Sequence, residues 1–284
     1  MSSIAIITDT DASLPAVVAE KYGIRQVPIN VLFGDEELET GVDIDDAQLF
    51  ARINREGRLP TTSAPSPGQF AKAYQAAFAN GADSIICFCV SGEVSATMGA
   101  AVNAKDLLPG RDIEVVDTRS LTMAQGFMVL EAAKAAASGA GKEEIIARAM
   151  DVGQRTHLYG ALATLKYLRM SGRVGHLTAG MASMLNIKPI LTIQEGKLDM
   201  LERIRTRKRA WARTIELAQE TANGRAIEQM AVVHVDCPDD AREFEQQLRA
   251  GLTCPSEIMM TELTAGLSVH SGAGFVGVVF VLAK

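Results

Sequence analysis

The chain has 284 residues, of which 48% are hydrophobic and 22% are charged, and its formal net charge is −6. This composition is typical of a globular protein and excludes a disordered one. The acidic balance disfavours general nucleic-acid binding, which needs a basic face, so we expect no nucleic-acid partner. The longest apolar runs are too short to cross a bilayer, and the N-terminus lacks the pattern of a secretory signal. We therefore expect a cytoplasmic protein.

Strands and helices alternate through the first part of the chain. Apolar runs predict strands at residues 3–10, 24–34, 82–91 and 112–118. Helical patterns predict helices at residues 14–23, 66–81, 94–108, 123–139 and 142–156. Alternation of this kind is typical of a parallel α/β sheet that is covered on both faces.

The pattern changes at about residue 157. Strands are predicted at 157–164, 187–206, 229–236, 255–263 and 274–283, and helices at 165–172, 176–185, 208–223 and 239–251. Closely spaced strands favour an α+β arrangement. The sequence therefore predicts an α/β protein of two domains, an N-terminal parallel α/β sandwich over residues 1–156 and a C-terminal α+β domain over residues 157–284.

Two of the four cysteines form a C-x-C pattern within the apolar run at 82–91. Cys87 and Cys89 would point to the same face of a strand, so a metal clamp and a pair of buried apolar side chains both stay open. We expect the second and therefore no metal site. The cysteine spacing indicates no disulfide framework.

Hydroxyl-bearing residues precede two of the predicted helices. Ser66 and Gln69 predict a capping box, which leaves Thr62 and Ser63 unexplained. Ser91 and Ser95, before the helix at 94–108, fit ordinary helix capping. The alternative is anion binding, because free N–H groups and the helix dipole attract negative charge at a helix start. Two such starts beside one sheet would face a common crevice.

Arg173 and His270 are the other candidate site residues. Arg173 follows Gly172 at the end of a predicted helix, where its charge either stabilises the helix C-terminus or grips a carboxylate or phosphate. His270 stands between glycine-containing turns before the last strand. It is either an ordinary hydrogen-bonded residue or a ligand contact, since Gly272 and Gly274 allow the backbone to approach a ligand closely.

The chain contains no GxxxxGK[ST] loop, no GxGxxG after its first strand and no GxSxG elbow. We therefore expect no ATP binding by this chain alone. Its residues by themselves predict an α/β protein with an anion-binding crevice and no nucleotide motif.

Seven segments carry, in order, the motifs of a known family. They are "IITDTDASLP" beside "ITDSTADLP", "GVDIDDAQLFARI" beside "GxDIxxxEFYxxL", "PTTSAPSPGQF" beside "PxTSQPSPGDF", "VSGEVSAT" beside "ISSxLSGT", "ATLKYLRMSGRVG" beside "xTLxYLxKGGRI", "MLNIKPIL" beside "LLNIKPIL" and "VHSGAGFVGVVF" beside "HxGPGxxGxxF". In these motifs the chain resembles the bacterial DegV family, the fatty-acid-binding proteins that serve as substrate subunits of fatty acid kinase.

The resemblance implies a two-domain fold that buries a long-chain fatty acid and holds its carboxylate near the domain junction. A separate kinase supplies ATP and Mg²⁺ and phosphorylates that carboxylate, so the chain is not expected to be an enzyme on its own or to carry a covalent cofactor. Its expected partners are the fatty acid, the kinase catalytic subunit and, transiently, a membrane for lipid exchange. The implied carboxylate contacts are Thr62, Ser63, Ser91, Ser95 and His270, and Arg173 and His270 are implied to support phosphoryl transfer.

An apolar slot for the acyl chain is expected within "HLTAGMASMLNI", where Met181, Met184 and Leu185 would line it or simply form core. The basic run at 203–213 is either a solvated helix start or a docking face for the kinase. Gly92 and Ala96 depart from the family motif, and at Gly92 one expected hydroxyl is missing.

An alternative function stays open. The chain would then be the substrate-binding subunit of a dihydroxyacetone-kinase-like enzyme, for a small hydroxylated substrate that bonds covalently to a histidine.

Overall fold

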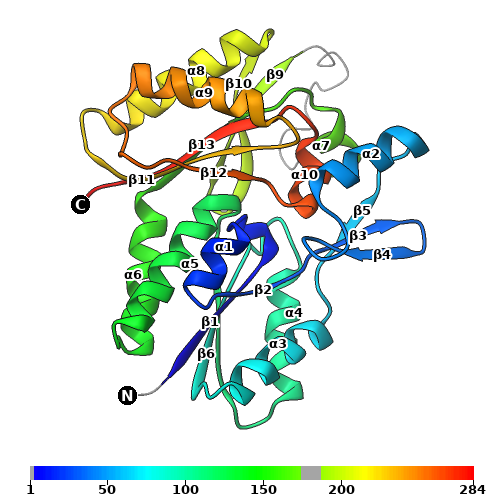
Figure 1. The fold of residues 1–284 in the computed structure, drawn as a ribbon, viewed down its shortest axis with the longest axis vertical. Helices are drawn as coiled ribbons and strands as arrows, with labels where there is room; N and C mark the ends of the chain where they lie inside the picture. The colour runs from blue at the N-terminus through cyan, green and yellow to red at the C-terminus, as the bar shows by residue number, and fades with distance from the viewer. Residues whose placement is uncertain (1–2, 174–186) are drawn as a thin grey trace.

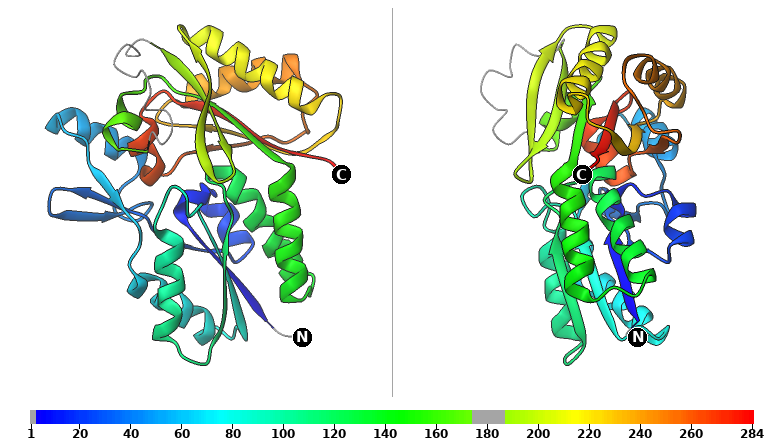
Figure 2. Two further views of the ribbon diagram at one scale, coloured as in Figure 1. Left: turned by 180° about the vertical axis from the view of Figure 1, so that it is seen from behind. Right: turned by 90° about the vertical axis from the view of Figure 1, so that its left-hand side faces the viewer.

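The computed structural model describes residues 3–173 and 187–284. These residues form two lobes that are stacked along the longest axis of the molecule, with a small third sheet projecting from one side (Figure 1). Each lobe is built around its own β-sheet. The chain ends lie on opposite lobes, the N-terminus at the base of one and the C-terminus at the side of the other (Figure 2).

The N-terminal lobe contains a four-stranded parallel sheet with the strand order β2-β1-β6-β7. Its strands are β1 (Ile4–Asp9), β2 (Arg25–Val27), β6 (Ser84–Cys89) and β7 (Asp112–Asp117). Its helices are α1 (Ala16–Lys21), α3 (Pro67–Ala79), α4 (Thr97–Asn103), α5 (Thr122–Ala137) and α6 (Lys142–Arg155), with a short 3-10 turn, η1 (Thr10–Ala12), after β1. All of β6 is buried because helices cover both faces of the sheet, which confirms the predicted parallel α/β layer.

The C-terminal lobe contains a six-stranded sheet with the order β10-β9-β8-β13-β11-β12, antiparallel except where β12 joins β11. Its strands are β8 (Thr156–Ala161), β9 (Lys188–Gln194), β10 (Lys197–Ile204), β11 (Ile227–His234), β12 (Met259–Glu262) and β13 (Val276–Leu282). Helices α8 (Arg207–Ala222) and α9 (Pro238–Gly251) cover its outer face. There Trp211 and Phe244 meet edge to face over the buried side chains of β13.

Helix α5 lies between the two sheets. It carries apolar residues on every side, and nearly all of them are buried. The helix contacts β1 and β6 below it and β8, β11 and β13 above it. One hydrophobic cluster therefore runs through both lobes, from Ile86 and Phe127 to Val233 and Val279. A helix that is apolar all round is stable only in such a position, between two layers.

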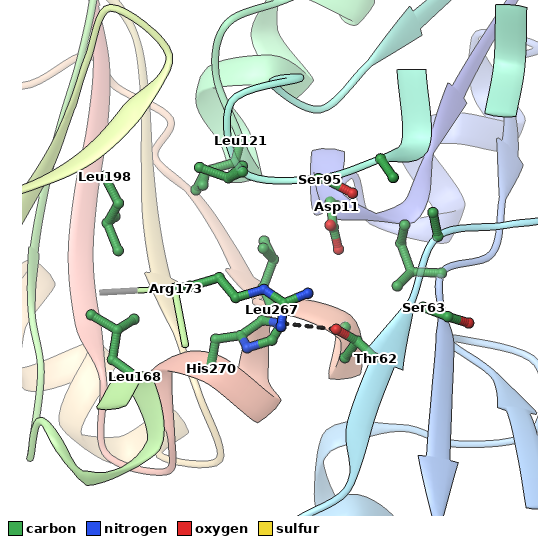
Figure 3. A pocket seen from close by; sticks show the side chains of 15 residues that line it. Asp11, Thr62, Ser63, Ser95, Leu121, Leu168, Arg173, Leu198, Leu267 and His270 are labelled. Carbon is green, nitrogen blue, oxygen red and sulfur yellow. Dashed lines mark hydrogen bonds between the residues drawn. The ribbon is translucent and has the colours of Figure 1, made fainter. Parts of the chain in front are cut away.

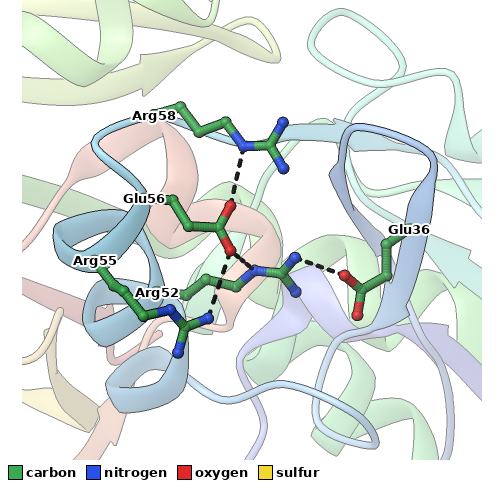
Figure 4. Close-up of polar contacts among 5 residues, drawn as sticks. All are labelled: Glu36, Arg52, Arg55, Glu56 and Arg58. Atoms are coloured by element: carbon green, nitrogen blue, oxygen red, sulfur yellow. Dashed lines mark hydrogen bonds and ion pairs between the residues drawn. The ribbon is translucent and has the colours of Figure 1, made fainter.

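The third sheet, β4-β3-β5, projects beside α2 (Asp46–Glu56). Its strands are β3 (Asn30–Phe33), β4 (Glu36–Glu39) and β5 (Thr61–Ser63). Arg52 of α2 clamps the hairpin, since its guanidinium lies 4.0 Å from the centre of the Phe33 ring and forms ion pairs with Glu36 and Glu56 (Figure 4). The sequence analysis did not predict this sheet and expected one strand over 24–34.

The lobes join without a linker. Helix α6 ends at Arg155, and β8 begins at the next residue, Thr156. The division into domains at residues 156 and 157 stays a prediction. Within the described part of the chain, no helix is both long and apolar enough to cross a membrane. The Cys87 and Cys89 sulfur atoms lie 3.8 Å apart in the core, and residues 3–173 and 187–284 hold no cluster of three or more metal-ligating side chains.

Candidate functional site

A cavity of about 320 Å³ lies at the junction of the two lobes (Figure 3). Segments from η1, β5, the loop after β6, the start of α5, α7 (Lys166–Met170), β10 and α10 (Ala265–Ser271) form its wall. Much of the lining is apolar, namely Ile29, Val94, Leu121, Leu168, Leu198 and Leu267. The polar lining residues come from both lobes and are Asp11, Thr62, Ser63, Ser95, Arg173 and His270. Such a cavity suits a ligand with an apolar body and a polar head.

Thr62 and His270 are brought together from opposite parts of the chain. Thr62 Oγ1 and His270 Nε2 lie 3.0 Å apart, a hydrogen bond across 208 sequence positions (Figure 3). Thr62 is on β5 of the small sheet, and His270 is on α10, which packs against that sheet. Among the described residues, His270 Nδ1 has no hydrogen-bond partner. One nitrogen of the ring is therefore engaged and the other is unused.

The predicted glycine-flanked turn around His270 is wrong, because His270 lies in the last turn of a helix, α10. Gly272 ends this helix with φ of +77°, and a Cβ at this position would lie 2.2 Å from the Tyr167 ring of α7. Only glycine permits both that backbone conformation and that approach. Gly272 thus serves the packing of α10 on α7, which holds the imidazole at the cavity wall.

Burial and the nearby Arg173 charge lower the pKa of His270 to about 4. The imidazole is therefore neutral at physiological pH, so one ring nitrogen carries a proton and the other accepts. If Nε2 donates to Thr62, the Thr62 hydroxyl is free to donate to a ligand. The pair can then offer an O–H donor to an anion without placing a full positive charge in the pocket.

Arg173 lines the cavity and remains exposed to solvent. Its Nη1 donates to the Ser171 carbonyl at 2.8 Å, directly after α7. Both interpretations of this arginine therefore coexist, since it contacts a carbonyl at a helix end and still points to the cavity (Figure 3). A solvent-facing guanidinium at the mouth of a pocket can meet an incoming phosphate.

The serines predicted to bind a carboxylate separate into two groups. Ser63 and Ser95 line the cavity, and Ser95 Oγ is 2.8 Å from Thr97 Oγ1. Ser91 is fully buried and does not line the cavity, because its hydroxyl donates to the Gly196 carbonyl at 2.7 Å. The N-cap residue of α4 is Ala96, which has no side chain to cap the helix, but Ser95 Oγ accepts from the Thr97 N–H at 3.3 Å.

That Ser91 contact belongs to a latch between the lobes, which we define as the β9–β10 turn and the loops that hold it. The turn residues Glu195 and Gly196 lie against the loops that follow β6 and β7. Arg119 donates to the Glu195 carbonyl, and Lys197 pairs with Glu93 at 3.5 Å. The latch holds β10, and with it Leu198, over the cavity.

Asp11 is a lining residue that the sequence analysis missed. It lies in η1 beside Asp9, and both carboxyl groups are buried. The available signal was a pair of acidic residues at the carboxyl end of the first strand, where α/β sheets bind ligands. The family opening quoted above has threonine at this position, so the resemblance gave no reason to select it.

Met181, Met184 and Leu185, the predicted acyl-chain lining, lie outside the described residues. Their role stays a prediction.

Comparison with known proteins agrees with the motifs. The family model described as "Uncharacterised protein, DegV family" matches residues 3–283. The chain belongs to the DegV family. A DegV domain-containing protein of Streptomyces coelicolor is 37% identical over 97% of both chains. Another from Mycobacterium tuberculosis is 34% identical over 97% of this chain and 96% of that relative.

Solved DegV structures share the whole fold. A DegV family protein from Thermus thermophilus, described by its fatty acid binding, superposes with a TM-score of 0.91 at 30% identity and covers 99% of this chain and 100% of its own. DegV from Bacillus subtilis, described as a fatty acid binding protein, gives a TM-score of 0.89 at 28% identity with full coverage of both chains. The two-lobe α/β architecture is therefore the DegV fold.

Proposed function

We propose that this protein binds a long-chain fatty acid in the cavity between its lobes and presents the carboxylate to a separate ATP-dependent kinase, which forms the acyl phosphate. The observation that carries the proposal is the Thr62–His270 pair on the wall of a largely apolar cavity. The descriptions of the Thermus and Bacillus relatives support the ligand class.

The head of the cavity suits a carboxylate. A carboxylate that leaves water without hydrogen-bond donors costs several kcal/mol. Thr62, Ser63 and Ser95 supply hydroxyl donors, and His270 orients the first of them. Because these groups are neutral, they hold the carboxylate without a tight ion pair, and its oxygen stays available as a nucleophile toward a phosphoryl group.

The body of the cavity suits an acyl chain. Burial of each methylene contributes about 0.8 kcal/mol, so a long chain supplies most of the binding free energy. The leucine side chains at 121, 168, 198 and 267 converge on the cavity from both lobes (Figure 3). A ligand that contacts both lobes also stabilises their junction.

The phosphoryl group must come from elsewhere, because the sequence has no phosphate-cradling loop. Arg173, exposed at the mouth of the cavity, would meet the negative charge that develops as the group transfers. This arrangement assigns binding to this chain and ATP chemistry to its partner.

The first test is organic extraction of the purified protein followed by mass spectrometry, in which we expect a long-chain fatty acid. Leu198→Trp, which fills the cavity, should abolish ligand uptake, whereas Leu107→Trp on the exposed surface should not. A protein that neither contains nor takes up fatty acid would contradict the proposal. The intact mass under denaturing conditions distinguishes this function from the alternative one. A covalent adduct on histidine would favour a small hydroxylated substrate.

The second test is incubation of the loaded protein with ATP and Mg²⁺. Without a kinase we expect no acyl phosphate, and with a bacterial fatty acid kinase catalytic subunit we expect its formation, trapped as a hydroxamate. Acyl phosphate formation by the isolated chain would contradict the assignment of the ATP site to a partner.

A further inference from the structure

Asp11 occupies the wall of the cavity that faces the Thr62–His270 pair (Figure 3). Its side chain comes from η1 of the N-terminal lobe, and only 6% of the residue is exposed. Gly266 of α10 packs directly on it, since a Cβ at 266 would lie 2.9 Å from Asp11 Oδ1. A side chain at position 266 would therefore displace the Asp11 carboxyl or the neighbouring Ile29.

The Asp11 carboxyl has an oxygen, Oδ1, that forms no hydrogen bond with the described residues. Its neighbour Asp9 is the opposite case, because Asp9 accepts from the Asp11 and Val90 backbone N–H groups at 3.0 and 2.8 Å and from Gln125 Nε2 at 3.2 Å. A buried polar atom without a partner is costly. Oδ1 is packed against Gly266, so the part of the carboxyl that a ligand can reach is the part that lines the cavity.

The same contacts decide which of the two carboxyl groups keeps a proton. Burial raises the pKa of both, but the donors around Asp9 hold its pKa at about 6. Burial and the neighbouring Asp9 charge raise the pKa of Asp11 well above its usual range, and the nearby Thr264 hydroxyl and the Arg173 charge oppose this only in part. The other titratable group in this wall of the cavity is His270, which is neutral. Asp9 is thus the ionised member of the pair and Asp11 the protonated one.

We propose that Asp11 is a specificity-determining residue, a carboxylic acid that donates its O–H to an anionic oxygen of the ligand headgroup bound between it and the Thr62–His270 pair. This inference rests on the proposed function and names a donor beyond those that the motifs supply. An O–H donor to an anion forms a short, charge-assisted hydrogen bond. The anionic head is then bound by Asp11 on one side and by the Thr62–His270 pair on the other.

The arrangement makes binding depend on pH with a defined sign. Below its pKa, Asp11 is neutral and donates to the anion. Above that pKa it is itself an anion, so it loses the donor and repels the headgroup. The affinity for an anionic ligand should therefore fall as the pH rises, by about 10- to 100-fold once Asp11 is fully ionised.

The test uses oleate and the uncharged oleyl alcohol as probes, with dissociation constants measured by calorimetry from about pH 7 to about pH 9, where oleate and Asp9 are both ionised. For the parent protein we expect the affinity for oleate to fall with pH and the affinity for the alcohol to stay constant. Asp11→Asn, whose amide donates at every pH, should bind oleate with a flat profile. Asp236→Asn, which changes an exposed carboxyl of raised pKa outside the cavity, should keep the parent profile.

Three outcomes would overturn the inference. The first is an identical pH profile of the parent protein for oleate and for the alcohol. The second is an oleate profile of Asp11→Asn that matches the parent profile. The third is tighter oleate binding by Asp11→Asn at every pH, which would mean that Asp11 is ionised in the parent. All three still show fatty acid binding, so they leave the proposed function intact. Failure of the parent protein to bind oleate at any pH would contradict both the inference about Asp11 and the proposed function. The comparison of the two probes on the parent protein does not depend on the folding of a variant.

Discussion

Arg173 and His270 both line the mouth of the cavity, yet their physical states differ. His270 is largely buried, neutral and hydrogen-bonded to Thr62, whereas Arg173 is exposed and donates a hydrogen bond to the nearby Ser171 carbonyl. A buried neutral group suits the resting carboxylate, and a free cation suits an arriving phosphoryl group. The two residues should therefore affect different steps.

Replacement of Arg173 by alanine should separate binding from transfer. We expect fold and fatty-acid affinity to remain close to the parent values, because the acyl chain supplies most of the binding free energy. The kinase-dependent transfer rate should fall by on the order of 100-fold, since a contact to developing charge acts on the transition state.

The control is Arg169→Ala, which removes an exposed arginine of α7, the helix that precedes Arg173, and this arginine does not line the cavity. Kinase-dependent turnover and ligand affinity would be measured for both variants. Equal transfer rates for Arg173→Ala and the parent protein would show that the residue has no part in the reaction.

At the scale of elements, a second buried carboxyl lies between α2 and α10. Asp46, the first residue of α2, accepts from Ser268 Oγ at 2.7 Å, while its other oxygen has no partner among the described residues. Burial raises the pKa of Asp46 to about 8. The folded protein therefore holds a proton here that the unfolded chain releases at much lower pH.

Asp46→Asn should stabilise the protein, and the gain should grow with pH. A folded-state pKa above the unfolded one means that the folded protein binds more protons, so the parent protein loses stability from about pH 4 up to about pH 8. The loss is about 1.4 kcal/mol for each pH unit in this window, so we expect the gain to be larger at about pH 8 than at about pH 5 by on the order of 4 kcal/mol. Urea denaturation at both pH values, with the exposed Asp106→Asn as control, checks this. A gain that is equal at the two pH values would mean that Asp46 does not titrate.

The elements with strong local signals were predicted from the sequence. The capping box of Ser66 and Gln69 starts α3, and the apolar run of β13 lies in the core sheet. Thr62 and His270 were selected through the family motifs, and the structure brings them into contact. The parallel sheet followed from the alternation of strands and helices.

The elements that depend on distant parts of the chain were not predicted. Strand β5 has only three residues and exists because it pairs with β3, about thirty positions away. Helix α10 contains a glycine and is too short to be stable alone, so its packing on α7 and α2 decides its conformation. Ser91 looked like a helix cap, and its actual partner lies 105 positions along the chain.

At the scale of the whole molecule, the lobes share one core. Helix α5 packs on both sheets, and the same hydrophobic cluster contains buried residues of each lobe. The junction of α6 and β8 offers no flexible segment. These features favour cooperative unfolding of the two lobes, although each has its own sheet.

We therefore expect a single unfolding transition. Trp211 fluorescence reports on the C-terminal lobe, and hydrogen exchange of β6 reports on the N-terminal lobe. The two transitions should coincide. Phe244→Ala, a change in the C-terminal lobe alone, should shift both transitions together and lower the free energy of unfolding by about 3–5 kcal/mol. Two separate transitions, or a loss confined to the tryptophan signal, would contradict a shared core.

The latch between the lobes has a consequence for how its sequence can vary. Two of its hydrogen bonds are accepted by the main-chain carbonyls of Glu195 and Gly196, so they do not depend on the side chain at position 195. That side chain is exposed, and its backbone has φ of 49°, a conformation that asparagine and glycine also adopt readily. Position 195 is thus free to diversify among relatives or to carry a spectroscopic label, whereas a residue without a side-chain donor at position 91 or 119 would remove one of these hydrogen bonds.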